Sequence, residues 1–483
     1  MLFNSYEFIF MFLPFTFFVY FFLLSKRLVT GAKGFLVFAS LFFYSWWNVL
    51  YLPLILSSML FNYVVGSSLN KEFEHRKVSK KQLLLFGLIA NLALLGYFKY
   101  TDFFLENFNG IFGADVPLLH IALPLAISFF TFQQIAYLVD SYRGETKEYD
   151  FLNYALFVTF FPQLIAGPIV HHKEMMPQFA SRWNLVKNYK NIALGLFIFS
   201  IGLFKKVVIA DTFAVWATNG FDKAETLNLI EAWATSLSYT FQLYFDFSGY
   251  ADMAIGIALL FNIKLPINFN SPYKALDIQD FWRRWHMTLS RFLRDYIYIP
   301  LGGNRYGSFR TYNNLMITFI LGGIWHGAGW TFIFWGFLHG LALVVHRLWK
   351  SFGMNMPRVL AWFITFNFIN IAWVFFRARE WEDAVKVLSA MFSLDNVVLP
   401  RELQFLNIDF VHHSNIWLSN IFADKYILLQ LLAALVIILL PKNSMSFHSS
   451  FTLNKVTLLF CIVLFVTSFL HLSGVHEFLY FNF

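Results

Sequence analysis

The sequence predicts an all-α polytopic membrane protein, and three observations support this fold class. Of the 483 residues, 58% are hydrophobic and only 13% are charged, whereas soluble domains carry about 25% charged residues. The apolar residues form continuous runs of roughly twenty, the length that a helix needs to span a bilayer. A membrane β-barrel would instead alternate apolar and polar residues. Helices satisfy their own backbone hydrogen bonds in lipid, which makes them the suitable spanning element. From the number of apolar runs we predict about 12 transmembrane crossings.

The first part of the chain contains five predicted crossings and one interrupted segment. The interrupted segment, 151–170, carries Pro162, Gly167 and Pro168, which would break a continuous helix. Because basic residues follow it, we expect this segment to be re-entrant. The first crossing has no basic residue before it, which favours a retained anchor over a cleaved secretory signal. The crossings are predicted at 8–24, 34–50, 51–66, 83–98 and 118–139.

The remaining crossings begin near residue 190. Two of them, at 190–209 and 229–245, precede a predicted half-helix that contains Asp246, Ser248, Tyr250 and Asp252. Acids at membrane depth do not face lipid. They could cap broken helices, bind a cation, or bond with tryptophan and arginine side chains. Later crossings are predicted at 312–325, 328–345 and 359–376, and on either side of the stretch PKNSMSFHSSFTLNK.

The basic residues gather in short loops, which sets the predicted orientation of the chain. Lys26, Arg27 and Lys33 follow the first crossing and place that loop in the cytoplasm. The polar re-entrant segment 264–311 would then lie at the cytoplasmic face, and the loop 377–425 at the outer face. This bias accounts for the formal charge of +8 without a nucleic acid partner. We treat residues 1–483 as a single membrane domain.

The segment from residue 281 to residue 305 combines aromatic and arginine residues. Wound as one helix, it places Phe281, Trp285 and Phe292 on one arc and arginines on the other. Such a helix suits a membrane surface, where arginines bind phosphates through paired hydrogen bonds. The phosphates could belong to a coenzyme or to lipid headgroups. The candidate residues are Arg283, Arg284, Arg291, Arg294 and Arg305.

Two histidines are candidates for chemistry. His326 lies in an apolar run between Gly323 and Gly327, and His286 lies at the edge of the apolar arc. An ionisable ring at membrane depth is costly, which makes it a functional candidate. For His326, a hydrogen bond within the helix bundle or a proton relay in a transporter are the alternatives. His339 follows His326 by a helical rotation of roughly 220°, so we expect it to pack or bond locally.

No metal site is expected from the histidine and cysteine pattern. The adjacent pairs His171–His172 and His412–His413 lack the spacing of metal ligands. Cys461 is the only cysteine, which excludes a disulfide framework and any multi-cysteine metal site.

Five motifs, taken in order, resemble the membrane-bound O-acyltransferase family, in the branch that acetylates bacterial cell-surface polysaccharides such as alginate and peptidoglycan. The resemblance covers nearly the whole chain, and five matches in order are highly specific. The motifs are SWWN at 45–48, FFPQLIAGPIV at 160–170, QLYFDFSGYADMAIG at 242–256, FWRRWHMTLSRFLRDYIYIPLGGNR at 281–305 and GGIWHGAGW at 322–330.

The resemblance implies transmembrane and re-entrant helices around a central funnel that joins the two membrane faces. It implies acetyl-CoA as the cytoplasmic acyl donor, with the acetyl group leaving on the outer side. The family's near-invariant histidine matches His326, and its second position matches His286. Attack of a hydroxyl on a thioester needs a base, the role assigned to His326. His286 would orient the thioester carbonyl or donate to the developing oxyanion.

The tail 476–483, HEFLYFNF, resembles the aromatic tail with a tyrosine seen in this branch and in small partner proteins of teichoic-acid D-alanylation. The resemblance implies that Tyr480 could accept the acetyl group and pass it on. Aromatic residues at a membrane edge are also common as anchors, and this alternative stays open.

The resemblance also implies a partner and a location. Several relatives carry a fused extracytoplasmic hydrolase-like domain, and nothing of that size follows Phe483. A separate periplasmic SGNH-hydrolase-like O-acetyltransferase is therefore expected, with this chain in the bacterial inner membrane among membrane lipids. The high Phe content (64 residues) and low Gly content (25 residues) indicate AT-rich coding, whereas alginate producers tend to be GC-rich. This difference favours peptidoglycan as the polymer. The alternatives are alginate or another exopolysaccharide, a lipid, sterol or peptide acceptor, and, from another class, a transporter or flippase.

Overall fold

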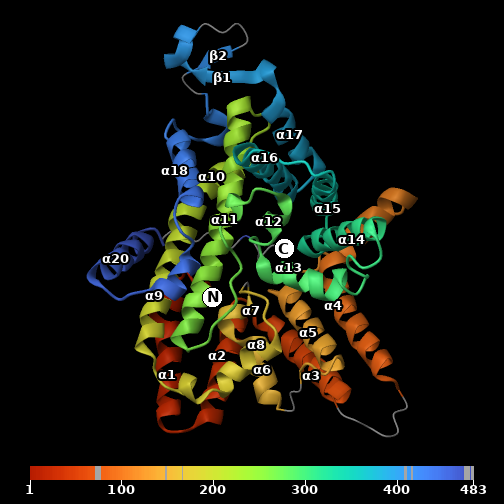
Figure 1. Ribbon diagram of the computed structural model, residues 1–483, viewed down its shortest axis with the longest axis vertical. Helices are drawn as coiled ribbons and strands as arrows, with labels where there is room; N and C mark the ends of the chain where they lie inside the picture. The colour runs from red at the N-terminus through yellow and green to blue at the C-terminus, as the bar shows by residue number, and fades with distance from the viewer. Residues whose placement is uncertain are drawn as a thin grey trace. The chain divides into compact units, whose positions relative to one another are not determined.

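A computed structural model describes residues 1–70, 78–146, 150–165, 167–406, 411–414, 417–472 and 479. The chain forms two compact units. Unit 1 comprises Met1–Phe204, Gly249–Ile267 and Phe447–Phe483, and unit 2 comprises Lys205–Ser248 and Asn268–Ser446. Helices dominate both units, as Figure 1 shows, so the predicted all-α class is confirmed. The single domain over residues 1–483 stays a prediction.

Unit 1 contains the N-terminal helices and two C-terminal ones. Its first helix begins with a π-helical turn, η1 (Glu7–Phe12), that continues into α1. The α-helices of unit 1 are α1 (Leu13–Ser25), α2 (Val29–Ser45), α3 (Leu52–Asn70), α4 (Lys80–Phe112), α5 (Ile127–Tyr142), α6 (Phe151–Thr159), α7 (Phe161–Leu164), α8 (His172–Ala180), α9 (Tyr189–Phe204), α19 (Phe447–Ser450) and α20 (Lys455–Leu470).

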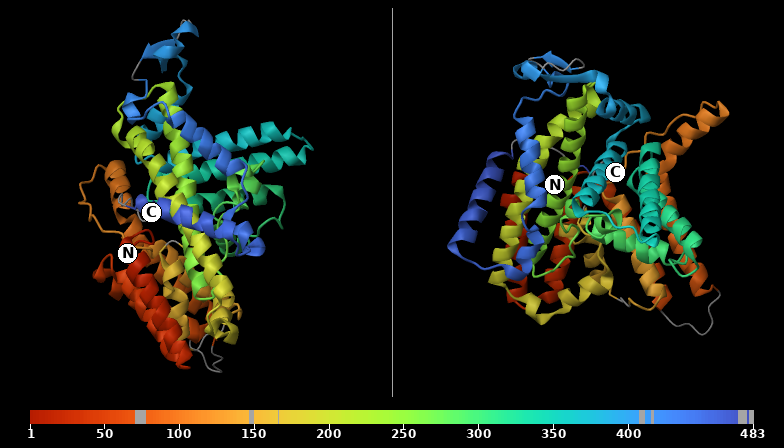
Figure 2. Two further views of the ribbon diagram at one scale, coloured as in Figure 1. Left: turned by 90° about the vertical axis from the view of Figure 1, so that its left-hand side faces the viewer. Right: turned by 45° about the horizontal axis from the view of Figure 1, so that its top comes forward.

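Unit 2 contains a further set of helices and a small parallel pair of strands, β1 (Val397–Pro400) and β2 (Val411–Ser414). Helix α11 (Leu229–Leu260) contributes residues 229–248 to unit 2 and residues 249–260 to unit 1. Figure 2 shows these elements from two further sides. Three π-helical turns, η4 (Lys205–Ala210), η5 (Asn219–Lys223) and η7 (Arg294–Tyr298), lie next to α-helices. The α-helices are α10 (Asp211–Thr218), α12 (Ile278–Trp282), α13 (Met287–Leu293), α14 (Ser308–His326), α15 (Trp330–Ser351), α16 (Arg358–Arg377), α17 (Trp381–Phe392) and α18 (Ile427–Leu439).

Within the described ranges, eight helical segments are long and apolar enough to cross a membrane. Two further apolar helices, Val29–Ser45 and Lys455–Leu470, are shorter. Many crossings are therefore confirmed, and the number of about 12 is not. The eight segments are Glu7–Ser25, Val49–Asn70, Lys80–Phe112, Tyr189–Lys223, Leu229–Leu260, Trp330–Ser351, Arg358–Arg377 and Ile427–Ser446.

The predicted half-helix after residue 245 is wrong. Helix α11 runs unbroken from Leu229 to Leu260, with Asp246 in its middle. Capping of a broken helix was one of the three roles considered for these acids. In the structure the carboxylate of Asp246 is instead compensated by a lysine within unit 2, which makes a break unnecessary.

The predicted break in segment 151–170 is confirmed. Helix α6 ends at Thr159 and α7 begins at Phe161, while Phe160 between them adopts a non-helical backbone conformation. Pro162 in the first turn of α7 has no N–H to continue α6. The backbone N–H of Phe161 donates to the Ser40 hydroxyl oxygen at 3.1 Å instead, so this buried donor is satisfied. The re-entrant course in the membrane stays a prediction.

Helices α14 and α15 approach each other closely through glycines. A Cβ atom on Gly323 would overlap the carbonyl oxygen of Phe332, and one on Gly336 would overlap that of Phe319. Small residues allow such close backbone contact between membrane helices, where dispersion forces and not apolar burial drive packing. The glycines around His326 therefore hold the end of α14 against α15.

Candidate active site

His326 is the last residue of α14, and aromatic rings surround it. Its side chain is buried, with 3% of the residue exposed. The centroids of the Trp325, Trp335 and Phe376 rings lie 4.8, 5.1 and 5.0 Å from that of His326. Three helices supply these rings, since Trp335 belongs to α15 and Phe376 to α16. His326 thus occupies an enclosed aromatic site within unit 2.

The glycines after His326 shape the connection from α14 to α15. Gly327 and Gly329 adopt extended backbone conformations that end one helix and begin the next. A Cβ atom on Gly327 would overlap the ring of Phe332. The short connection therefore packs directly on α15, and it brings Trp335 to the His326 ring.

His286 lies at a break in the segment predicted as one helix. Helix α12 ends at Trp282, α13 begins at Met287, and His286 between them has a left-handed backbone with φ of +41°. The single-helix prediction is therefore wrong, although its aromatic arc is buried as expected from Phe281 to Leu293. A left-handed histidine costs about 1 kcal/mol or more, so tertiary contacts must stabilise the break.

Asn268 supplies those contacts. The backbone N–H of Met287 donates to the Asn268 carbonyl oxygen at 3.0 Å. The Oδ1 atom of Asn268 accepts from the backbone N–H and the hydroxyl of Thr288, at 3.2 and 2.7 Å. These bonds satisfy donors at the start of α13, which the helix cannot satisfy internally. Nothing in the sequence pattern singled out Asn268, because its partners lie about twenty residues away.

Trp325 brings the two predicted histidines together. Its ring centroid lies 6.3 Å from that of His286 and 4.8 Å from that of His326. On its other side His286 contacts Phe247 of α11, with centroids 4.7 Å apart. His286 is fully buried, and burial lowers the pKa of its imidazole to about 3. The ring is therefore neutral at pH 7 and can act as a hydrogen-bond donor or acceptor.

His339 of α15 belongs to the same group of rings and has one specific hydrogen bond to another helix. The indole Nε1–H of Trp282 donates to its Nδ1 atom at 3.2 Å. Its ring lies 4.7 Å from Trp335, which also contacts His326. His339 therefore packs within the bundle, as expected, although its hydrogen-bond partner comes from another helix and not from its own. We refer to His286, Trp325, His326, Trp335 and His339 as the ring cluster.

The comparison with protein families decides what kind of protein this site belongs to. The model described as the membrane-bound O-acyltransferase family matches residues 8–379, which includes the whole ring cluster. The chain belongs to the membrane-bound O-acyltransferase family. It is therefore a multi-pass membrane acyltransferase, and the hypothesis of a transporter or flippase is not retained.

Three similar proteins are named for three acyl-transfer reactions. The chain is 53% identical to a peptidoglycan O-acetyltransferase of Helicobacter pylori, over 100% of this chain and 98% of that protein. It is 43% identical to a probable alginate O-acetylase of Pseudomonas aeruginosa, over 81% of this chain and 75% of that protein. It is 29% identical to a teichoic acid D-alanyltransferase of Streptococcus thermophilus, over 52% of this chain and 68% of that protein.

The candidate arginines of this O-acyltransferase are held by separate local acceptors. Arg284 Nε donates to Asp280 at 2.9 Å, and Arg294 Nε donates to Asp295 at 2.7 Å. Arg305 donates to the carbonyl oxygens of Gly302 and Ile299. Arg283 is exposed and Arg291 is half-buried. The structure therefore keeps several cations at the surface of this segment, and their role as a coenzyme site stays a prediction.

Asp246 takes part in a second buried polar group, which we call the lysine cluster. Lys206 Nζ lies 2.7 Å from Asp246 Oδ1 and 2.9 Å from Asp211 Oδ1, and all three side chains are less than a tenth exposed. The interpretation of Asp246 as a cap of a broken helix was wrong, because α11 continues through it. The partner of Asp246 could have been predicted from the sequence, because Lys206 is a basic residue within the predicted crossing 190–209 and a buried charge needs a partner.

The other sequence candidates lie apart from the ring cluster in the chain. His171 Nδ1 lies 3.3 Å from Asp140 Oδ2 in unit 1, which indicates an ion pair or hydrogen bond. In unit 1 the ring of Tyr250 stacks on Phe3, with centroids 4.6 Å apart. Over the described residues, no group of three or more metal-ligating side chains is found. Tyr480 lies outside the described residues.

Proposed function

We propose that this acyltransferase moves acetyl groups from cytoplasmic acetyl-CoA across the inner membrane for O-acetylation of peptidoglycan. The observation that carries this proposal is the similarity to the Helicobacter pylori peptidoglycan O-acetyltransferase, which extends over both chains almost completely. Similarity to the probable alginate O-acetylase covers less of each protein. Both relatives support an acetyl group as the cargo and a polysaccharide as the final acceptor.

The ring cluster supports His326 as the general base. In the proposed step, His326 takes the proton from an acceptor hydroxyl as its oxygen attacks the thioester carbonyl. A C–O bond forms, the C–S bond breaks, and the imidazolium returns the proton to the thiolate of coenzyme A. General bases of this kind contribute about 10² to 10⁴ in rate. The surrounding rings exclude water, which would otherwise hydrolyse the thioester.

His286 is assigned as the group that orients the thioester carbonyl or donates to its oxyanion. Its neutral ring has one N–H to donate, and Asn268 holds the backbone that positions it. Donors aimed at a developing oxyanion are worth about 10² to 10³ in rate. Both histidines contact Trp325, which supports a shared site for the two roles.

The remaining parts of the proposal concern donor and acceptor. Arg283, Arg284, Arg291, Arg294 and Arg305 would bind the phosphates of the coenzyme at the cytoplasmic face. The phenol of Tyr480 would accept the acetyl group and pass it to a separate periplasmic SGNH-hydrolase-like transferase. A phenolic ester is a competent acyl donor because phenolate leaves more readily than an alkoxide.

Labelled acetyl-CoA tests this proposal in inverted membrane vesicles. We expect label on the protein, loss of that label in Tyr480→Phe, and release of free coenzyme A that depends on His326. In cells lacking the gene, ester-linked acetate on peptidoglycan should fall and be restored by the native chain. Unchanged wall acetate would exclude peptidoglycan, and loss of acetate from an exopolysaccharide instead would identify the alternative polymer. Unchanged coenzyme A release in His326→Ala would exclude the base assignment.

A further inference from the structure

A groove in unit 2 has the polarity of a phospholipid site. It adjoins the ring cluster through Phe368, whose ring centroid lies 5.5 Å from that of His339, but no ring-cluster residue lines it. Its volume is about 600 Å³, within the range of small-molecule sites. The C-terminal half of α15 and the N-terminal half of α16 form its walls, with Leu276–Ile278 at the start of α12 and the connection 354–356 at one end. None of these segments was assigned a role by the motifs.

One end of this groove is apolar along both helices. Leu338, Leu341 and Val345 recur on one face of α15, and Ile364 and Phe368 face the groove from α16. Leu341, Val345 and Ile364 are between 41% and 53% exposed. Both helices are candidate membrane spans, and exposed apolar side chains on such helices suit contact with hydrocarbon. The apolar face from residue 338 to residue 349 is about 16 Å long, close to half the thickness of a bilayer's hydrocarbon core.

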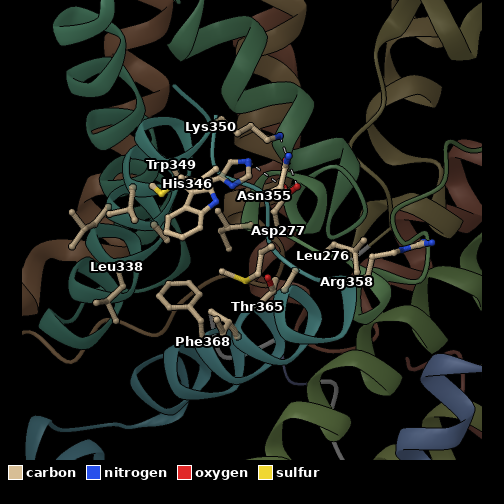
Figure 3. Close-up of a pocket in the computed structure, with 18 residues that line it drawn as sticks. Leu276, Asp277, Leu338, His346, Trp349, Lys350, Asn355, Arg358, Thr365 and Phe368 are labelled. Atoms are coloured by element: carbon tan, nitrogen blue, oxygen red, sulfur yellow. Dashed lines mark ion pairs between the residues drawn. The ribbon is translucent and has the colours of Figure 1, made fainter. Parts of the chain in front are cut away.

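The charged lining residues lie where α15 ends and α16 begins, with Arg358 extending away from Lys350 and Asp277 in Figure 3. Lys350 lies in the last turn of α15, Arg358 is the first residue of α16, and Asp277 precedes α12. Asp277 is already partnered, because its carboxylate lies 3.5 Å from His346 Nε2 and 3.9 Å from Lys350 Nζ. Figure 3 shows Lys350 and His346 directed toward Asp277, with Leu338 and Phe368 on the other side of the groove.

We propose that this groove binds a glycerophospholipid, with an acyl chain on the apolar face and the phosphodiester at Lys350 and Arg358. Two permanent cations against one partnered carboxylate leave a net positive mouth, which attracts a phosphate. The asparagine side chain at Asn355 lines the same end and adds a hydrogen-bond donor. The separation of charge and apolar surface along one groove matches an amphiphile of one leaflet. A soluble nucleotide would leave the apolar face exposed, and a neutral lipid would leave the cations unused.

Native mass spectrometry of the purified full chain tests the proposal with dioleoyl phosphatidylglycerol, the matching phosphatidylethanolamine and dioleoylglycerol. We expect both phospholipids to be retained, and dioleoylglycerol to bind at least ten-fold more weakly because it lacks the phosphate. The double variant Lys350→Ala/Arg358→Ala should weaken phosphatidylglycerol binding by about thirty-fold. The matched control Arg347→Ala/Arg310→Ala removes two exposed cations from α15 and α14 outside the groove and should leave binding unchanged.

A second variant tests occupancy of the groove by filling it. Ala361 lines the groove on α16, and Ala361→Trp should fill it and displace the lipid. If that variant does not fold, the charge variants and the dioleoylglycerol comparison still decide the question. Equal binding of dioleoylglycerol, or equal weakening by both double variants, would overturn the proposal. Acetyl transfer is measured separately, so loss of lipid binding and loss of the proposed activity are distinguishable.

Discussion

The ring cluster and the lysine cluster are both buried in unit 2, but they hold their polar groups in opposite ways. The histidines of the ring cluster are packed against aromatic faces, and His339 accepts a neutral hydrogen bond from Trp282. In the lysine cluster, an ammonium group lies between two carboxylates at 2.7 and 2.9 Å. One cluster therefore contains groups that can exchange a proton, and the other contains charges that stabilise one another.

This difference suits the ring cluster to a chemical role and the lysine cluster to a structural one. A neutral imidazole is less costly to bury than an ion, so it can face a substrate and gain or lose a proton during reaction. A buried ion pair is strongly destabilised when one partner is removed. Buried polar residues within one unit therefore need not share a role, and substitutions in the two clusters should fail in different ways.

The largest effect is expected from replacing His326. His326→Gln should reduce coenzyme A release and wall acetylation by about 10² to 10⁴ because the base is lost. His339→Gln is the matched control, since glutamine can still accept the Trp282 hydrogen bond, and it should lose less than about ten-fold. Size-exclusion chromatography checks that both variants fold. Equal losses in the two would mean that the ring cluster is only structural.

The second effect concerns stability. Asp246→Asn removes one carboxylate from Lys206 and should lower the free energy of unfolding by about 3 to 5 kcal/mol. Thermal unfolding in detergent measures this change. The surviving folded fraction should keep a specific activity within a few-fold of the native value. Glu382→Gln, at an exposed acid on α17, is the control and should leave the unfolding temperature unchanged. An activity loss without destabilisation would place Asp246 in the reaction.

A smaller effect is expected at the break that holds His286. Asn268→Ala removes the oxygen that accepts two bonds from Thr288, and should cost about 1 to 3 kcal/mol in stability. Because the position of His286 depends on these bonds, kcat should fall by about ten-fold. Thr288→Val keeps the backbone bond and should give an intermediate result. If kcat is unchanged in both variants, His286 does not act from this position.

The smallest effect is expected from the exposed arginines, which belong to neither cluster. Arg283→Ala should change the free energy of unfolding by less than about 0.5 kcal/mol, as is usual for surface residues. The KM for acetyl-CoA should rise about five-fold if a phosphate contact is lost, while kcat stays the same. Arg310→Ala, an exposed residue of α14, should change neither quantity. Equal KM values for the two variants would assign Arg283 to orientation or lipid contact only.

The amino-acid sequence alone determined the membrane class and the broken segment at Pro162, and it singled out the two histidines that the structure places around Trp325. These features depend on local composition, on helix-breaking residues and on the cost of burying an ionisable ring, all of which can be judged within one segment. The five motifs also predicted the acyltransferase family that the comparison confirms.

Tertiary structure decided where these helices continue or break and which side chains contact one another. Helix α11 stays continuous at Asp246 because Lys206, forty residues earlier, neutralises its charge. Between α12 and α13, Asn268 accepts hydrogen bonds from donors at the start of α13, which stabilises the break at His286. Trp325 contacts both histidines only once α14 meets the segment before it. Helical periodicity is local, whereas ion pairs, caps and ring contacts depend on partners that folding brings from elsewhere in the chain.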